Sequence, residues 1–414
     1  MKLELEISRM KNIAISKINN IPRKGVARQK IISELKKRLD CDFSFGSGRI
    51  VGSMCTSPHP FAQSVFCLNT EKNLGDPGLF PGTAQIEKEV TGMLASLLSY
   101  SGAAGNIVSG GTEANILALW AARDSRNGRN STVRQKDEVI IPDSAHFCFD
   151  KAANLLKLNL IKVKLNNQFQ VDVKKVKNAI TSKTLAIVGI AGTTDLGVVD
   201  PIPELSKIAL AHNLHLHVDA AFGGFVLPFT NNSNIPPFDF RLPGVSSITI
   251  DPHKMGLAPI PSGVILFRNP MLLEKIQMPV KYLAGGESPQ TLLGTRPGAS
   301  AIAVWALLKH LGTDGYKKTV KNCMNLTHRF AQEIEKIPGL SLVTKPVLNI
   351  VGIKSSVVSI TDLSTGLRRK GWAVAHFPNH IRIVLMPHIR SSHVSMIIND
   401  LKTIMGSLTN KGVL

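Results

Sequence analysis

The chain has 414 residues, 43% of them hydrophobic, and a slightly positive mean hydropathy, which excludes a disordered protein and predicts a folded one of about two domains. No apolar run reaches the roughly 20 residues that a membrane-spanning helix needs, and the charged N-terminus lacks the apolar stretch of a secretory signal. The net charge is +20, yet the basic residues are spread out and form no block typical of nucleic-acid binding.

Strands and helices alternate from about residue 85 onward. The first 45 residues have a helical pattern with basic faces, and residues 1–60 are taken as an N-terminal helical segment. Helical spacing is found over 85–100, 112–126 and 202–213, and apolar strands over 103–111, 137–146, 185–197, 214–224 and 246–254. This alternation predicts an α/β fold with a mostly parallel sheet flanked by helices.

Small and polar residues follow the apolar strands. They are Gly110-Gly111-Thr112, His146, Thr193-Thr194, Asp219 and His253-Lys254. Ligands of parallel sheets bind beyond the carboxyl ends of the strands, so we expect these residues to converge on one site.

The last hundred residues have a different pattern. A helix over 315–337 is followed by short apolar strands and a closing helix, which predicts a small α+β domain. We therefore divide the chain after its N-terminal segment into a large domain, 61–310, and a small C-terminal domain, 311–414.

Lys254 follows the apolar strand of "SITIDPHK". A buried ammonium group is costly unless it is paired or loses its charge. The lysine could extend to water from the strand end, or it could be held in a cleft because its amine reacts. In the second case we expect its apolar surroundings to lower its pKa.

Two further motifs are ambiguous by themselves. "SGGTEAN" can be an ordinary strand-to-helix turn, or an anion cradle in which glycines allow close approach to helix N–H groups. "HLHVDAAFGG" places His215, His217 and Asp219 on one face of a strand, which would suit a metal. However, no further ligand is evident, and a lone carboxylate before small alanines could instead hold a cationic heterocycle. A phosphate cradle, such an acid, a histidine that could stack and a lysine together match the needs of pyridoxal 5'-phosphate (PLP).

The chain resembles the group II PLP-dependent decarboxylases of fold type I, an aspartate-aminotransferase-like fold, and within them most closely the archaeal L-tyrosine/L-aspartate decarboxylases. The resemblance covers roughly residues 25–400. It rests on "GSMCTSPHP", "NLGDPGLFPGT", "VSGGTEANILAL", "PDSAHFCFDKAA", "AGTTDLGVVDPI", "HVDAAFGGF", "DPHKMGLAP", "GTRPGASA" and "IRIVLMPH".

The resemblance implies roles for individual residues. Lys254 would form the Schiff base, and Asp219 would pair with the pyridine nitrogen. His146 would stack on one ring face and help to orient the carboxylate that is lost, and Ala221 would support the other face. The remaining cofactor contacts would come from Gly111, Thr112, Thr193 and His253. One departure is Cys148, where the family often has serine.

Four assignments depend on less specific matches. Thr295 would reach the phosphate from a second subunit, since sites of this fold form at a dimer interface. Arg382 would bind a substrate carboxylate, unless it is a surface strand residue. His59, in "GSMCTSPHP", is a second candidate for substrate binding. Tyr282 would donate the proton to Cα, unless it only packs its loop.

The resemblance thus implies a PLP-dependent decarboxylase that acts on an L-amino acid. Aspartate would give β-alanine for coenzyme A synthesis, and tyrosine would give tyramine. A PLP enzyme acting on aminoacyl-tRNA and a PLP-dependent carbon–carbon lyase are the alternatives. A homodimer without membrane or nucleic-acid partners is expected, and five cysteines without a CxxC pair indicate a cytoplasmic protein.

Overall fold

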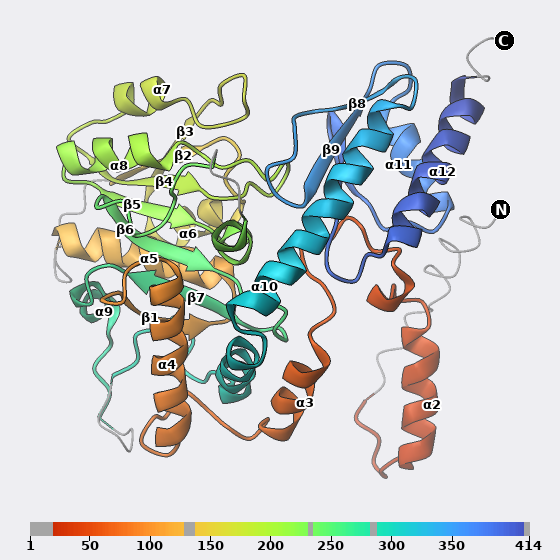
Figure 1. The fold of residues 1–414 in the computed structure, drawn as a ribbon. Helices are drawn as coiled ribbons and strands as arrows, with labels where there is room; N and C mark the ends of the chain where they lie inside the picture. The colour runs from red at the N-terminus through yellow and green to blue at the C-terminus, as the bar shows by residue number, and fades with distance from the viewer. Residues whose placement is uncertain (1–19, 128–136, 231–234, 282–287, 410–414) are drawn as a thin grey trace.

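A seven-stranded sheet forms the centre of the larger part of the protein (Figure 1). The structure is a computed structural model that describes residues 20–127, 137–230, 235–281 and 288–409. The strand order is β1-β7-β6-β5-β4-β2-β3. The strands are β1 (Ala104–Val108), β2 (Glu138–Pro142), β3 (Asn159–Val163), β4 (Thr184–Ile190), β5 (His215–Asp219), β6 (Val245–Ile250) and β7 (Gly263–Phe267).

The sheet is parallel except at β7, which runs antiparallel to both of its neighbours, β1 and β6. Because β1 and β6 are both antiparallel to β7, β1 runs in the same direction as β6 and the other strands. The carboxyl ends of β1, β2, β4, β5 and β6 therefore meet at one edge. Every residue of β4 and β7 is buried, as expected for strands covered on both faces.

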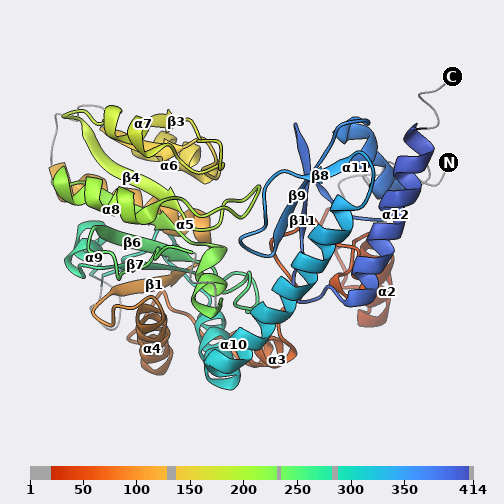
Figure 2. The same ribbon diagram turned by 45° about the horizontal axis from the view of Figure 1, so that its top comes forward.

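Helices cover both faces of this sheet. On one face lie α5 (Gly111–Asn127), α6 (Cys148–Leu156) and α9 (Met271–Ile276). On the other face lie α4 (Pro81–Leu97), below β1 in Figure 2, and α8 (Ile202–Ala211), with α7 (Val173–Asn178) beside α8. Short 3-10 turns, Gly223–Phe225 and Leu227–Phe229, follow β5. Among the described residues, no helix is both long and apolar enough to span a bilayer.

The C-terminal part has its own sheet and its own core. Its antiparallel strand order is β10-β11-β9-β8, from β8 (Leu340–Leu342), β9 (Ile350–Ser355), β10 (Ala375–Phe377) and β11 (His380–Val384). Apolar residues of α11 (Ile360–Arg369), α12 (Ser391–Thr409) and the end of α10 pack on it. This is the α+β arrangement that the sequence predicts.

The long helix α10 (Gly298–Glu335) connects the two parts and runs diagonally between them in Figure 1. It bends at Gly312, whose φ of 56° lies in the left-handed region that glycine adopts without steric cost. The bend lies one residue beyond the predicted domain boundary. The boundary itself stays a prediction.

From residue 20, where the structure begins to describe the chain, the N-terminal region is less helical than we predicted. Between residues 20 and 60 the only α-helix is α2 (Arg28–Leu39), and α3 begins at Pro60 and ends at Leu68. Pro22 and Gly25 precede α2, and both residue types disfavour helix. Beyond it, the chain joins the C-terminal part: Val384 donates a backbone hydrogen bond to Val51, and Gly52 donates one to Ala373.

Candidate active site

A cavity of about 360 Å³ opens at the carboxyl edge of the large sheet. Its wall includes these residues from the sequence-based set: Gly111, Thr112, His146, Asp219, Ala221, His253 and Lys254. They follow β1, β2, β5 and β6. The predicted convergence of strand ends is therefore found in the structure, while the chemical role of each residue stays a prediction.

Lys254 lies in this cavity as an ion pair. Its Nζ is 3.0 Å from Oδ2 of Asp251, and its side chain is only 19% exposed. Burial acts to lower the pKa of Lys254, but the carboxylates of Asp251 and Asp219 outweigh burial, and the pKa lies above its ordinary value. The expected lowering of this pKa is thus wrong, because a carboxylate three residues earlier offsets the apolar surroundings.

The strand-to-helix turn after β1 has the features of an anion cradle. Helix α5 begins at Gly111, with Gly110 before it. A Cβ atom on Gly110 would lie 3.1 Å from His253, and one on Gly111 would lie 3.0 Å from Asp251. A larger residue at either position would force these side chains to move, so the two glycines let the turn approach the β6 loop closely. The first N–H groups of α5 therefore border a cavity that a phosphate could enter.

His253 lies beside this turn on the cavity wall. Its Nδ1 must donate to the carbonyl oxygen of Ser262, because a carbonyl only accepts. The other ring nitrogen, Nε2, is 3.7 Å from Oδ2 of Asp251. The ring orientation is thus set by the backbone of the residue that precedes β7.

Asp219 ends β5 and is 7% exposed. Its Oδ1 accepts a hydrogen bond from the backbone N–H of Ala221 at 3.1 Å, and its Oδ2 accepts one from Asn115 at 2.9 Å. The carboxylate is therefore held at both oxygens. It faces the same cavity as Lys254, as the pairing with a cationic ring nitrogen would require.

The two histidines of the H-x-H-x-D pattern do not join Asp219 as ligands. His215 and His217 both form hydrogen bonds to Ser247, at 2.7 and 2.8 Å. Burial lowers the pKa of each histidine to about 3. Among the described residues, no group of three His, Cys, Asp or Glu side chains is placed to hold a metal.

His146 and Cys148 lie side by side on the cavity wall. Nδ1 of His146 accepts the backbone N–H of Cys148 at 3.3 Å, and burial lowers the pKa of this histidine, although Asp219 opposes the effect. The thiol of Cys148 is contacted by the amide of Asn115 at 3.2 Å, and its pKa is raised by burial to about 12. The residue at this position thus keeps a polar contact even though it is not serine.

Arg382 is not a surface residue. It is 8% exposed, and its guanidinium group donates to the carbonyl oxygens of Thr194 and Gly52. Its Nε has no hydrogen-bond partner in the part of the chain that the structure describes, and burial lowers its pKa to about 10. Because Thr194 lines the cavity, Arg382 stands directly behind the cavity wall.

Four predicted site residues lie elsewhere or are not described. Thr193 is buried and accepts the N–H of Val198, and its neighbour Thr194 lines the cavity instead. His59 caps α3 by accepting the N–H of Phe61, and it is not among the residues that line the cavity. Thr295 is exposed, and Tyr282 lies outside the described residues. Their assigned roles stay predictions.

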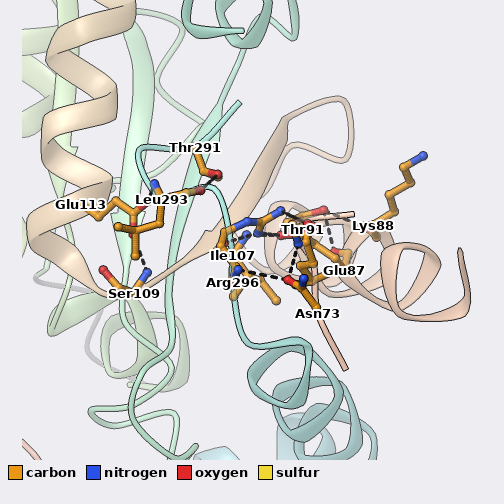
Figure 3. Close-up of polar contacts among 12 residues, drawn as sticks. Asn73, Glu87, Lys88, Thr91, Ile107, Ser109, Glu113, Thr291, Leu293 and Arg296 are labelled. Atoms are coloured by element: carbon orange, nitrogen blue, oxygen red, sulfur yellow. Dashed lines mark hydrogen bonds and ion pairs between the residues drawn. The ribbon is translucent and has the colours of Figure 1, made fainter. Parts of the chain in front are cut away.

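Figure 3 shows two sets of polar contacts that hold the segment before α10, residues 291–296, against α5, α4 and β1. Glu113, in the first turn of α5, accepts the backbone N–H groups of Ser109, Leu292 and Leu293 at 2.8 to 3.3 Å. Arg296 forms a buried ion pair with Glu87 of α4 and also donates to the carbonyl oxygen of Ile107. The exposed Thr295 lies between these two attachment points.

Breaking the second attachment should destabilise the fold. Glu87→Gln leaves the guanidinium group of Arg296 buried without its counter-charge, and we expect the free energy of unfolding to fall by about 3–5 kcal/mol. Urea unfolding of the holoenzyme measures the change. Glu34→Gln, which breaks the exposed pair with Arg38, is the control and should change stability little. An equal, small effect of both variants would contradict the prediction.

Comparison with known proteins decides the family. Residues 20–355 match the pyridoxal-dependent decarboxylase conserved domain. The chain belongs to this family. It is 51% identical over 386 residues to an L-aspartate decarboxylase of Thermococcus kodakarensis, covering 92% of this chain and 98% of that protein. It is 48% identical to a probable L-tyrosine/L-aspartate decarboxylase of Methanothermobacter thermautotrophicus, covering 87% of this chain and 98% of that protein.

Solved structures place this decarboxylase in PLP fold type I. A sphingosine-1-phosphate lyase of Burkholderia pseudomallei has a TM-score of 0.88 at 26% identity, with 97% of this chain and 95% of that chain covered. A glutamate decarboxylase of Lactobacillus brevis has a TM-score of 0.82 at 25% identity, with 96% and 97% covered. The resemblance inferred from the motifs, the fold and the PLP-dependent carboxy-lyase activity are thereby confirmed.

The cavity fits PLP by its own geometry. The helix N-terminus bordered by two glycines suits the phosphate, and the held carboxylate of Asp219 suits the ring nitrogen. Oδ1 of Asp251, buried beside Lys254, has no hydrogen-bond partner among the residues that the structure describes. When bound, PLP would supply an electron sink for the electron pair that stays on Cα as CO₂ leaves. In the predicted assignment the protein would provide the amine of Lys254, the anion cradle and the counter-charge for the ring.

Sequence reasoning missed two polar residues of this site. Asp251, in "DPHK", lies three residues before Lys254 and is not in the set of predicted site residues. Asn115, in "SGGTEAN", comes one helical turn after Gly111, so its side chain lies on the same side of α5 as the cradle. In both cases the spacing could have revealed a side chain aimed at the site.

Proposed function

We propose that the enzyme converts L-aspartate to β-alanine, which would serve coenzyme A synthesis. The supporting observation is the 51% identity to the L-aspartate decarboxylase of T. kodakarensis over nearly the whole of both chains. The location of Arg382 agrees with a substrate that carries two carboxylates. Its positive charge stands behind Thr194, where it could attract an acidic side chain.

L-Tyrosine is the second candidate substrate. The observation that favours it is the name of the M. thermautotrophicus relative, which includes both amino acids. The L-aspartate/L-glutamate decarboxylase of Pyrococcus horikoshii, 48% identical to this chain, adds glutamate to the substrates that need testing.

Substrate preference is measured with the PLP-loaded enzyme and each amino acid separately. Quantifying β-alanine, γ-aminobutyrate and tyramine gives kcat/KM for each reaction. We expect aspartate to exceed tyrosine by roughly 10⁴-fold, because a site built for a polar substrate group leaves its own polar groups unpaired when the substrate lacks that group. A larger kcat/KM for tyrosine would overturn the aspartate proposal.

Decarboxylation is favoured over the two other PLP reactions that the sequence left open. The relatives that cover most of both chains are named decarboxylases, whereas the lyase of B. pseudomallei shares 26% of its residues. An enzyme acting on aminoacyl-tRNA would bind tRNA with a steep salt dependence and release no CO₂ from free amino acids. Release of CO₂ from free aspartate therefore separates it from the proposed reaction.

We also propose that the enzyme is a cytoplasmic homodimer in which Thr295 reaches the partner's phosphate site. Helix α2 has no buried residue, and its apolar residues Ile31, Ile32, Leu35 and Leu39 are all at least 43% exposed. Such a surface favours association with a second copy. The five cysteines are all free, which agrees with a reducing compartment.

Shared sites predict a specific result for mixed dimers. Lys254→Ala and Thr295→Ala are each expected to be poorly active alone. After co-refolding, one site of the mixed dimer would have both native residues, so activity should recover to roughly a quarter of the wild type. This fraction follows from random pairing, in which half of the dimers are mixed and each restores one of two sites. No recovery, with a dimer seen by light scattering, would contradict the role of Thr295.

A further inference from the structure

Asn115 lies between Asp219 and a buried polar cluster on β5 and β6. It is 1% exposed and belongs to α5, which packs against both strands (Figure 1). Its Nδ2 donates to Oδ2 of Asp219 at 2.9 Å. Its Oδ1 is 2.9 Å from Nε2 of His217 and 2.7 Å from Oγ1 of Thr249. The amide thus uses both ends in hydrogen bonds.

The direction of each bond follows from the chemistry of the groups. A carboxylate only accepts, so the amide nitrogen of Asn115 must face Asp219 and its oxygen must face His217. His217 therefore has its proton on Nε2, and its Nδ1 accepts the hydroxyl proton of Ser247. The oxygen of Ser247 in turn accepts from Nε2 of His215. Every donor in the chain points toward Asp219.

This chain requires a neutral His217, since a ring with protons on both nitrogens could not accept from Ser247. His217 is fully buried, and burial lowers its pKa to about 3. The charged groups nearest the chain do not reverse this conclusion, because Asp219 contacts the amide of Asn115 rather than the imidazole. His217 can therefore keep one tautomer across the pH range in which the enzyme would work.

We propose that Asn115 is a positioning residue, which holds the carboxylate of Asp219 toward the cavity and is itself held by His217 and Thr249. This inference rests on the proposed role of Asp219 as partner of the ring nitrogen. The backbone N–H of Ala221 fixes Oδ1, and Asn115 fixes Oδ2. Without the amide, the carboxylate could rotate about its last bond and lose its alignment with the ring.

The central experiment is a double-mutant cycle with Asn115→Ala and Asp219→Asn. Two quantities are measured: kcat for the amino acid substrate, and the Kd of PLP from titration of the apoenzyme followed by visible absorption. Asn115→Ala should lower kcat on the order of 10- to 100-fold, the usual effect of removing a hydrogen-bonded partner that orients a ligand. It should also weaken PLP binding. In the Asp219→Asn background it should change the Kd little further, because the two residues act as a unit.

Two further variants separate positioning from a general loss of stability. Thr249→Val removes one donor to Oδ1 of Asn115 but leaves its bond to Asp219, so a smaller effect than that of Asn115→Ala is expected. Thr327→Val removes a hydroxyl from a site that is also fully buried but lies in α10, where it bonds to Cys323, and it should leave kcat and Kd unchanged.

The outcomes distinguish the inference from the role on which it rests. Near-wild-type kcat in Asp219→Asn would refute the assignment of Asp219 itself. Loss of activity in Asp219→Asn together with fully additive effects of Asn115→Ala on the Kd of PLP would refute only the positioning role. Wild-type Kd and kcat in Asn115→Ala would refute it as well.

Discussion

Lys254→Ala is expected to abolish decarboxylation, with kcat lowered by roughly 10⁴-fold or more, as is usual when a covalent catalytic residue is removed. The amine of Lys254 is paired with Asp251 inside the cavity that also contains the held carboxylate of Asp219. No other lysine lines that cavity among the described residues. Its loss therefore removes the group that can bind the cofactor covalently.

Chemical labelling tests the same residue independently of turnover. Borohydride reduction of the PLP-loaded enzyme should attach the cofactor to Lys254, and peptide mapping by mass spectrometry locates it. Lys207→Ala, at an exposed position of α8, is the control and should retain both activity and labelling. Attachment to a different lysine in the wild-type enzyme would overturn the site assignment.

Asp219→Asn is expected to lower kcat by on the order of 10³-fold, comparable to the loss of one strong electrostatic contact in other enzymes. The variant keeps the size of the side chain but removes the negative charge that would keep the ring nitrogen protonated. Because Asn115 and Ala221 both donate to this side chain, the amide NH₂ group would also lack an acceptor on one side.

The measurement is kcat with aspartate, together with the visible spectrum of the bound cofactor. Asp314→Asn, an exposed residue of α10, should leave both unchanged. If Asp219→Asn retains nearly the full rate, the predicted role of Asp219 is wrong and its carboxylate is only a structural group at the end of β5.

The mostly parallel character of the large sheet and the location of the site could be predicted from the sequence. Apolar runs that end in small or polar residues identify parallel strands, and their carboxyl ends lie at one edge. The order of β1-β7-β6 could not be read from the sequence. It depends on β7 pairing between two strands that are far apart along the chain, and local patterns carry no information on such pairing.

The sequence by itself thus determined the family, the cofactor and the placement of Lys254, His146 and Asp219 around one cavity, because these depend on motifs and on strand periodicity. The tertiary structure decided how those groups are held and charged. It placed Asp251 against Lys254, which reversed the expected shift in pKa, and it put Asn115 of α5 against Asp219 of β5. It also buried Arg382 against Thr194 and Gly52, from three separate parts of the chain. Charges and hydrogen bonds act over a few ångströms in space, so they are fixed only when packing brings distant segments together.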